Sequence, residues 1–207
     1  MPPKKPATSK GRTATIERKT GETDIKLTMN LDGTGVYDVD TGNGFLDHMV
    51  SQISRHGLID INLKAIGDVH VGWHHLVEDV AITLGRAFND ALGDARGIRR
   101  MGHAMVPLDE TLAMVALDCS GRGYAVIDTT LDEIMVETLP GSLVKHFFES
   151  FALEGNINLH AKIITGVSPH HKAEALCKAL ARSLRDALEP DPRAPSAIPS
   201  TKGILNS

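Results

Sequence analysis

The sequence contains few aromatic residues, since Phe, Trp and Tyr make up only 4% of its 207 positions. Aliphatic side chains must therefore supply most of the packing in a folded core. The sequence also lacks any apolar run near the roughly 18 residues that a membrane-spanning helix needs, so we expect no membrane association. The net charge of −4 gives no basic excess. A nucleic-acid partner is therefore not expected.

Cysteine is equally scarce, and the two that occur, Cys119 and Cys177, are far apart and lack CxxC spacing. Each is predicted to be a buried, reduced thiol, which favours a cytoplasmic location. The opening residues MPPKKPATSKGR have no apolar stretch and do not resemble a secretory signal. Pro, Lys and Ser are frequent there, so residues 1–11 are predicted to form a disordered tail.

The sequence does contain an internal repeat. Apolar residues between positions 74 and 92 recur at the spacing of one helical face. Shifted by 96 positions, they coincide with a second such face, between positions 170 and 188. The segment INLKA likewise coincides with INLHA, and a two-residue adjustment aligns the segments further upstream. The polar residues that coincide are His48 with His146, His74 with His170, His75 with His171, and Glu78 with Glu174.

Each copy is predicted to contain a helix, a strand and a second helix. The strand-like segments TATIERKT and DIKLTMNLDG precede the first copy. Between the copies, ETLAMVALDCSGRGYAVIDTT contains two strand-like runs separated by SGRG, and this arrangement mirrors the amino-terminal hairpin. We therefore predict an α+β fold formed by internal duplication, in which helices cover one face of a small sheet in each half. One domain should span residues 12–207, with repeats at about 12–95 and 96–192 and a tail at 193–207.

The repeated histidines indicate metal sites. Residues i and i+4 lie on one face of a helix, so His74 with Glu78, and His170 with Glu174, can each hold one metal ion. The adjacent His75 and His171 point about 100° away and should serve a different ion. Three imidazoles and one carboxylate suit Mn, Fe, Co, Ni or Zn. The predicted sites are His48, His75, His170 and Glu174 for one ion, and His74, Glu78, His146 and His171 for the other.

A single histidine on an apolar helix is more often a satisfied core or surface residue than a ligand. The duplication of the whole pattern favours metal binding here. His70, His103 and His160 have no counterpart of this kind, and we expect them at the surface or in supporting positions. Cations and hydroxyls that suit phosphate occur in three short segments, although each is a weak signal alone. These residues are Arg99, Arg100, Arg122, Ser200, Thr201 and Lys202.

Taken together, several segments resemble the imidazoleglycerol-phosphate dehydratase family. They include GFLDHMVSQISRHG, GDVHVGWHHLVEDVAITLG, GIRRMGHAMVPLDETLAMVALDCSGRGY, HHKAEALCKALARSL and STKGIL, and the resemblance extends from about Gly11 to the carboxyl end. It implies duplicated halves of the ribosomal-protein-S5-domain-2-like or ferredoxin-like type. It also implies two Mn²⁺ ions per active site at contacts between chains, and a homo-oligomeric shell of 24 subunits.

The resemblance further implies a reaction, the loss of water from D-erythro-imidazole glycerol phosphate to give imidazole acetol phosphate in histidine biosynthesis. The substrate ring would bind the two metal ions as an imidazolate and accept electrons as hydroxide leaves. The implied metal ligands are His48, His74, His75, Glu78, His146, His170, His171 and Glu174, and all of these except His146 would also contact the substrate. Arg100, Arg122, Ser200, Thr201 and Lys202 would hold its phosphate, and Glu22, Gln52, His56 and Lys178 would line the pocket.

Catalytic roles would fall to Glu22, Glu78, Glu174 and Lys178, and Glu22 is the preferred group for proton transfer. Lys178 and a metal-bound water remain alternatives. One segment departs from the family pattern, because Gly72 and Trp73 precede the first histidine pair where relatives commonly have acidic residues. Two other functions stay open, namely a binuclear metal hydrolase of a phosphorylated metabolite and a non-catalytic metal-binding paralogue.

Overall fold

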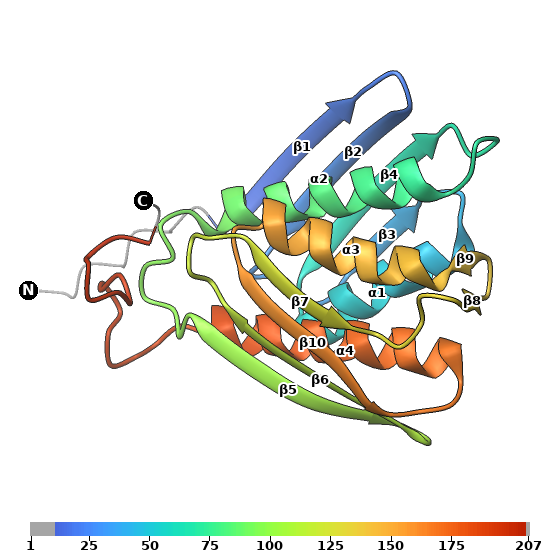
Figure 1. Cartoon of the computed structure of the whole chain (residues 1–207). Coiled ribbons are helices and arrows are strands. Elements are labelled where there is room, and N and C mark those ends of the chain that lie inside the picture. The colour runs from blue at the N-terminus through green and yellow to red at the C-terminus, as the bar shows by residue number, and fades with distance from the viewer. Residues whose placement is uncertain (1–10, 206–207) are drawn as a thin grey trace, which may run out of the picture.

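The computed structural model describes residues 11–205. Apart from Gly11, the predicted disordered tail lies outside these residues. Two halves follow one another in the chain, each with a four-stranded sheet and two main helices (Figure 1). The first half contains β1 (Thr13–Lys19), β2 (Thr23–Asn30), β3 (Tyr37–Asp40), α1 (Gly44–Gly57), β4 (Asp60–Gly67) and α2 (His74–Leu92). The second contains β5 (Met101–Leu108), β6 (Thr111–Asp118), β7 (Tyr124–Asp128), β8 (Met135–Val136), β9 (Leu139–Pro140), α3 (Gly141–Glu154), β10 (Asn158–Thr165) and α4 (Pro169–Leu188).

The two sheets have the same topology. The first has the strand order β1-β2-β4-β3 and the second β5-β6-β10-β7. In each sheet only the last-named edge strand is parallel to its neighbour. Alternating residues of the central strands are buried, as the period-2 pattern predicts, and examples are Leu27, Leu63 and Leu159. The predicted α+β fold with internal duplication is therefore confirmed.

One detail of the predicted arrangement is wrong. The turn SGRG was expected to close a hairpin, but the strands on either side of it, β6 and β7, are not neighbours, because β10 lies between them. The true counterpart of the amino-terminal hairpin is β5–β6, which turns at Asp109 and Glu110. A parallel partner needs a crossover rather than a tight turn, and β7 pairs in parallel with β10.

All four long helices lie between the two sheets (Figure 1). In the first half α1 and α2 cover the inner face of the sheet, and in the second half α3 and α4 do so. The helices also pack in pairs across the middle, α2 against α3 and α1 against α4. Their apolar stripes, with Phe88, Leu84, Leu176 and Leu180 among them, form one continuous core. Among the described residues, no helix has the length and apolar character to cross a membrane.

The beginnings of α2 and α4 differ. Ser168 caps α4 by accepting a hydrogen bond from the His171 backbone N–H at 3.3 Å, and Pro169 follows at the first helical position. In α2 the capping position is Trp73, whose side chain accepts no such bond. Gly72 precedes it with φ of +139°, a conformation that an L side chain rarely adopts. The GWHH segment thus enters α2 without the usual polar cap.

Candidate functional site

One group of predicted ligands gathers where α1 meets the first turns of α4. We call it the His170 cluster, made of His48, His170 and Glu174. Their ligand atoms all lie within 4.8 Å of one another. Glu174 Oε2 lies 2.9 Å from His48 Nε2 and 3.1 Å from His170 Nε2. The cluster joins residues 126 positions apart because α1 and α4 pack together.

The repeat-related group lies where α2 meets α3. We call it the His146 cluster, made of His74, Glu78 and His146, and its ligand atoms also lie within 4.8 Å of one another. The rings of His74 and His146 stack with centroids 4.8 Å apart. Glu78 Oε1 lies 3.3 Å from His146 Nε2 without a hydrogen bond between them. Within the described part of the chain, this buried nitrogen has no hydrogen-bond partner.

His75 and His171 stand apart from both clusters. Nδ1 of His75 lies 3.0 Å from Asp68, and its Nε2 lies 3.8 Å from Glu22. In the other half, Nδ1 of His171 lies 2.7 Å from Glu110, and its Nε2 lies 3.8 Å from Asp109. Hydrogen bonding to Asp68 raises the pKa of His75, and hydrogen bonding to Glu110 raises that of His171. A single chain therefore brings together three of the four residues predicted for each site.

Carboxylates that hold Nδ1 of these histidines were not predicted. Besides Asp68 and Glu110, Glu137 lies 3.1 Å from Nδ1 of His170. In each case the carboxylate contacts Nδ1, so Nε2 is the nitrogen that could coordinate a metal ion, an arrangement typical of metal-binding histidines. Asp68 lies seven residues before His75 and was visible in the sequence beside the histidine pair. Glu110 and Glu137 lie 61 and 33 residues from their partners, so no local spacing could indicate them.

Lys178 and two α1 residues border the His170 cluster. Lys178 Nζ lies 2.6 Å from Glu174 Oε1. Burial raises the pKa of Glu174, but the hydrogen bonds with Lys178 and His48 outweigh it and lower the pKa to about 2. Gln52 follows His48 by one turn and lies 3.1 Å from His56 Nε2. Burial lowers the pKa of His56, and the charges of Lys178 and Arg182 lower it further.

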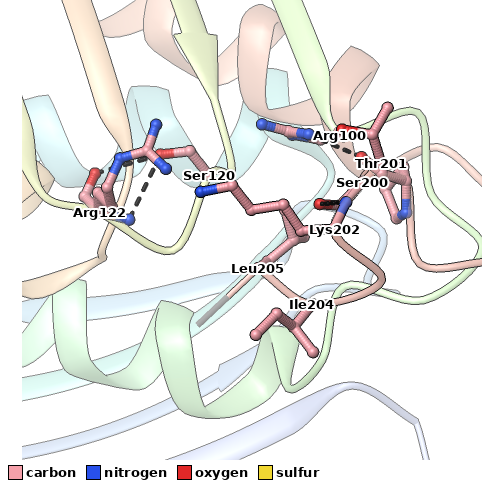
Figure 2. Close-up of a pocket in the computed structure, with 9 residues that line it drawn as sticks. Arg100, Ser120, Arg122, Ser200, Thr201, Lys202, Ile204 and Leu205 are labelled. Carbon is pink, nitrogen blue, oxygen red and sulfur yellow. Dashed lines mark hydrogen bonds between the residues drawn. The ribbon is translucent and has the colours of Figure 1, made fainter. Parts of the chain in front are cut away.

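All of the predicted phosphate residues except Arg99 line a pocket of about 570 Å³. In Figure 2 the Lys202 side chain extends between Arg100 on one side and Ser120 with Arg122 on the other. Arg100 is fixed by two bonds to Asp118, at 2.7 and 2.9 Å, and by one to the Pro199 carbonyl at 2.7 Å. Arg99 turns away and pairs with Asp186. The pocket is lined by Arg100, Ser120, Arg122, Pro199, Ser200, Thr201, Lys202, Ile204 and Leu205.

This pocket and the histidine clusters lie at opposite ends of the helices. The Arg100 backbone N–H donates to the Ala187 carbonyl near the end of α4, whereas His170 and His171 lie in its first turn. At a rise of about 1.5 Å per residue, the 16 residues from His171 to Ala187 span about 24 Å. Figure 1 shows the carboxyl-terminal segment in red at the far end of α4 from the loop that enters it. His70, His103 and His160 are exposed elsewhere, as expected.

Sequence comparison agrees with this arrangement. A family model described as imidazoleglycerol-phosphate dehydratase matches residues 41–184. An imidazoleglycerol-phosphate dehydratase of Dehalococcoides mccartyi strain CBDB1 is 57% identical over 196 residues, which is 95% of this chain and 98% of the relative. The enzyme of the same name from Roseiflexus sp. strain RS-1 is 54% identical over 194 residues, covering 94% of this chain and 98% of that protein.

Two solved structures share the fold. Imidazoleglycerol-phosphate dehydratase from Staphylococcus aureus N315 superposes with a TM-score of 0.77 at 31% identity, covering 86% of this chain and 99% of that one. The structure from Pyrococcus furiosus, in complex with (S)-C348, superposes with a TM-score of 0.79 at 32% identity. The match covers 92% of this chain and 100% of that one. The chain therefore belongs to the imidazoleglycerol-phosphate dehydratase family of lyases.

Proposed function

We propose that this protein removes water from D-erythro-imidazole glycerol phosphate to form imidazole acetol phosphate in histidine biosynthesis. Family membership supports the reaction class. The observation that carries the proposal is the pair of repeat-related clusters, each with two imidazoles and one carboxylate within 4.8 Å. A substrate that presents an imidazole ring with two nitrogens suits a centre with two metal ions.

The donor set fits two Mn²⁺ ions. Imidazole and carboxylate without thiolate suit divalent metals of this kind. The buried, unpaired Nε2 of His146 supports the assignment, because burying a polar atom without a partner costs free energy unless a ligand satisfies it. His48, His170 and Glu174 would hold one ion, and His74, Glu78 and His146 the other. When bound, the ions would act as Lewis acids on the substrate ring and orient it.

The active site would combine residues from different copies of the chain. Because the phosphate pocket lies beside the end of α4 and the His170 cluster beside its first turns, about 24 Å away along the helix, one small substrate does not reach both within one chain. His75 and His171, which belong to neither cluster and whose Nε2 atoms lie 3.8 Å from Glu22 and Asp109, would complete the clusters of neighbouring copies. We propose a homo-oligomeric shell of 24 subunits, located in the cytoplasm, as the assembly that provides these contacts.

The residues of the phosphate pocket and of the β1–β2 hairpin would then have separate roles in the reaction. Arg100, Arg122, Ser200, Thr201 and Lys202 would bind the phosphate and fix the position of the reacting carbons. The Glu22 carboxylate lies in the exposed turn between β1 and β2, 3.8 Å from His75 Nε2. It would take the proton from the carbon beside the ring, since a carboxylate near cations can serve as a general base. Lys178, whose Nζ lies 2.6 Å from Glu174, would be the alternative group for this proton transfer.

The test is turnover on a metal-analysed sample. Purified protein freed of metal by a chelator should be inactive, and added Mn²⁺ should restore conversion of imidazole glycerol phosphate to the ketone product. Release of inorganic phosphate without ketone would instead indicate a binuclear hydrolase. Metal-loaded protein that produces neither, and that fails to support growth of a histidine-requiring strain lacking its own dehydratase, would indicate a non-catalytic paralogue.

A further inference from the structure

The two clusters are related by the internal repeat but are not equally charged. His170 and Glu174 match His74 and Glu78 at a shift of 96 positions, and His48 matches His146 at a shift of 98. The ligand types are therefore identical. Any difference between two metal ions held there must come from the residues around the ligands.

The first difference lies one turn beyond the ligand carboxylate. In α4 this position is Lys178, whose ammonium group contacts Glu174 at 2.6 Å and is only 19% exposed. The equivalent position in α2 is Ile82, an uncharged side chain. One ligand carboxylate therefore already has a cation on its second oxygen. The other, Glu78, has no lysine or arginine partner among residues 11–205.

The second difference lies one turn beyond the α3 histidine. Glu149 places a carboxylate oxygen 4.0 Å from His146 Nδ1. The matching residue of α1 is Ser51, whose hydroxyl donates to the Asp47 carbonyl.

These contacts leave the clusters with different charge. Around the His146 cluster, Glu78 and Glu149 contribute two negative charges. Around the His170 cluster, the charge of Glu174 is offset by Lys178, and the more exposed Glu137 contributes one negative charge. The histidines proposed to come from neighbouring copies, His75 and His171, would not change this difference in charge between the clusters. Each of them lies beside two carboxylates of its own chain, so both would bring the same number of negative charges.

We propose that the two metal sites have unequal affinity, with the His146 cluster the tighter site and Lys178 the residue that weakens the His170 cluster. This inference rests on the proposed metal centre and extends it. A dication is attracted more strongly to the more negative site, and an ammonium group beside a ligand carboxylate repels the incoming ion. The His146 cluster would fill first, and metal at the His170 cluster would complete the centre.

The test is a titration of the metal-free protein with Mn²⁺, monitored by calorimetry and by the EPR signal of free Mn²⁺. Two classes of site are expected, with affinities differing by about 10-fold to 100-fold, the range typical of residues that support metal ligands. His146→Gln should remove the tight class and His48→Gln the weak class. A single class of equal sites, or loss of the classes in the reverse order, would overturn the proposal.

Charge variants identify the cause. Lys178→Met should raise the affinity of the weak class by about 10-fold, while Lys178→Arg should preserve the difference. Ile82→Lys should weaken the tight class. Lys162→Met, on the outer face of the second sheet, is the matched control that should change neither class. If Lys178→Met leaves both affinities unchanged, the proposed role of Lys178 is wrong but the proposed function is not affected. If wild-type protein binds no metal at all, both the unequal-affinity proposal and the proposed function are wrong.

Discussion

The side chains of His75 and Asp68 meet at 3.0 Å, Nδ1 to Oδ2, across the loop that leads into α2. The same nitrogen of the repeat-related His171 meets Glu110 at 2.7 Å. The two carboxylates do not occupy equivalent positions, since Asp68 follows β4 and Glu110 belongs to the β5–β6 hairpin. Asp68 and Glu110, which are not related by the repeat, thus each place a carboxylate beside Nδ1 of equivalent histidines. The contact therefore does not follow from the duplication alone.

We predict that Asp68→Ala and Glu110→Ala each lower Mn²⁺ affinity by about 10-fold to 100-fold, because the imidazole loses the partner that fixes its orientation and tautomer. Asp68→Asn and Glu110→Gln keep an acceptor oxygen and should have smaller effects. Calorimetric titration of metal-free protein measures the affinity. Asp38→Asn, at an exposed acid paired with Lys64, is the control. Wild-type affinity in both alanine variants would show that these carboxylates do not support ligands.

The elements and residues that were predictable are those defined by local periodicity. The helical stripes of α2 and α4 and the repeated HHxxE spacing predicted that His74 lies beside Glu78 and His170 beside Glu174. The structure places the first pair beside His146 of α3 and the second beside His48 of α1. Strand β5 was not predicted. It is an edge strand whose sequence, MGHAMVPL, includes Gly and Pro, and it exists because β6 offers a pairing edge.

The assignment of His75 and His171 shows the limit of helical geometry. Their direction away from His74 and His170 follows from 100° per residue. What they face depends on loops far away in the sequence and, in our proposal, on other copies of the chain. The separation between Lys202 and the clusters could not be predicted from the sequence either, because it depends on the direction of α4 and not on any motif.

For the phosphate pocket we predict that Lys202→Met raises KM by about 10-fold or more with little change in kcat. Lysine would contact the phosphate in both the bound substrate and the transition state, so its loss removes uniform binding. One hydrogen bond to a charged group contributes about 1.5–3 kcal/mol. Steady-state kinetics on imidazole glycerol phosphate measure the change, with Lys162→Met as the control. A fall in kcat at unchanged KM would contradict a phosphate-binding role.

Asp60 gives a prediction for pH. Burial raises its pKa, but the backbone N–H groups of Val36 and Thr34, which donate at 2.9 and 2.8 Å, outweigh burial and lower the pKa overall. A carboxyl whose pKa is lower in the folded state stabilises the fold above the unfolded pKa of about 3.9. That contribution is lost as the pH falls through the folded pKa.

We therefore expect Asp60→Asn to reduce the free energy of unfolding by about 1 kcal/mol at pH 7. The difference from wild type should shrink below about pH 4 as the wild-type carboxyl becomes protonated. Denaturant unfolding of metal-free protein at a series of pH values measures it, because removing metal separates this effect from protonation of the histidines. Asp38→Asn is again the exposed control. If the difference in unfolding free energy between wild type and Asp60→Asn stayed constant down to about pH 3, the stabilisation would come from packing and not from the charge of Asp60.

The last prediction concerns the residue after a proposed ligand. Asp79 is 5% exposed and receives two bonds from Arg18, at 3.0 and 2.7 Å, and one from the Thr23 hydroxyl. It thereby joins α2 to both strands of the amino-terminal hairpin, which also contains Glu22. Asp79→Ala leaves the Arg18 charge without its partner and should cost about 2–4 kcal/mol of unfolding free energy. Asp79→Asn should cost less, because it still accepts from Thr23. Denaturant unfolding measures both, and Glu17→Ala, an exposed partner of Lys26, should change stability by less than about 0.5 kcal/mol.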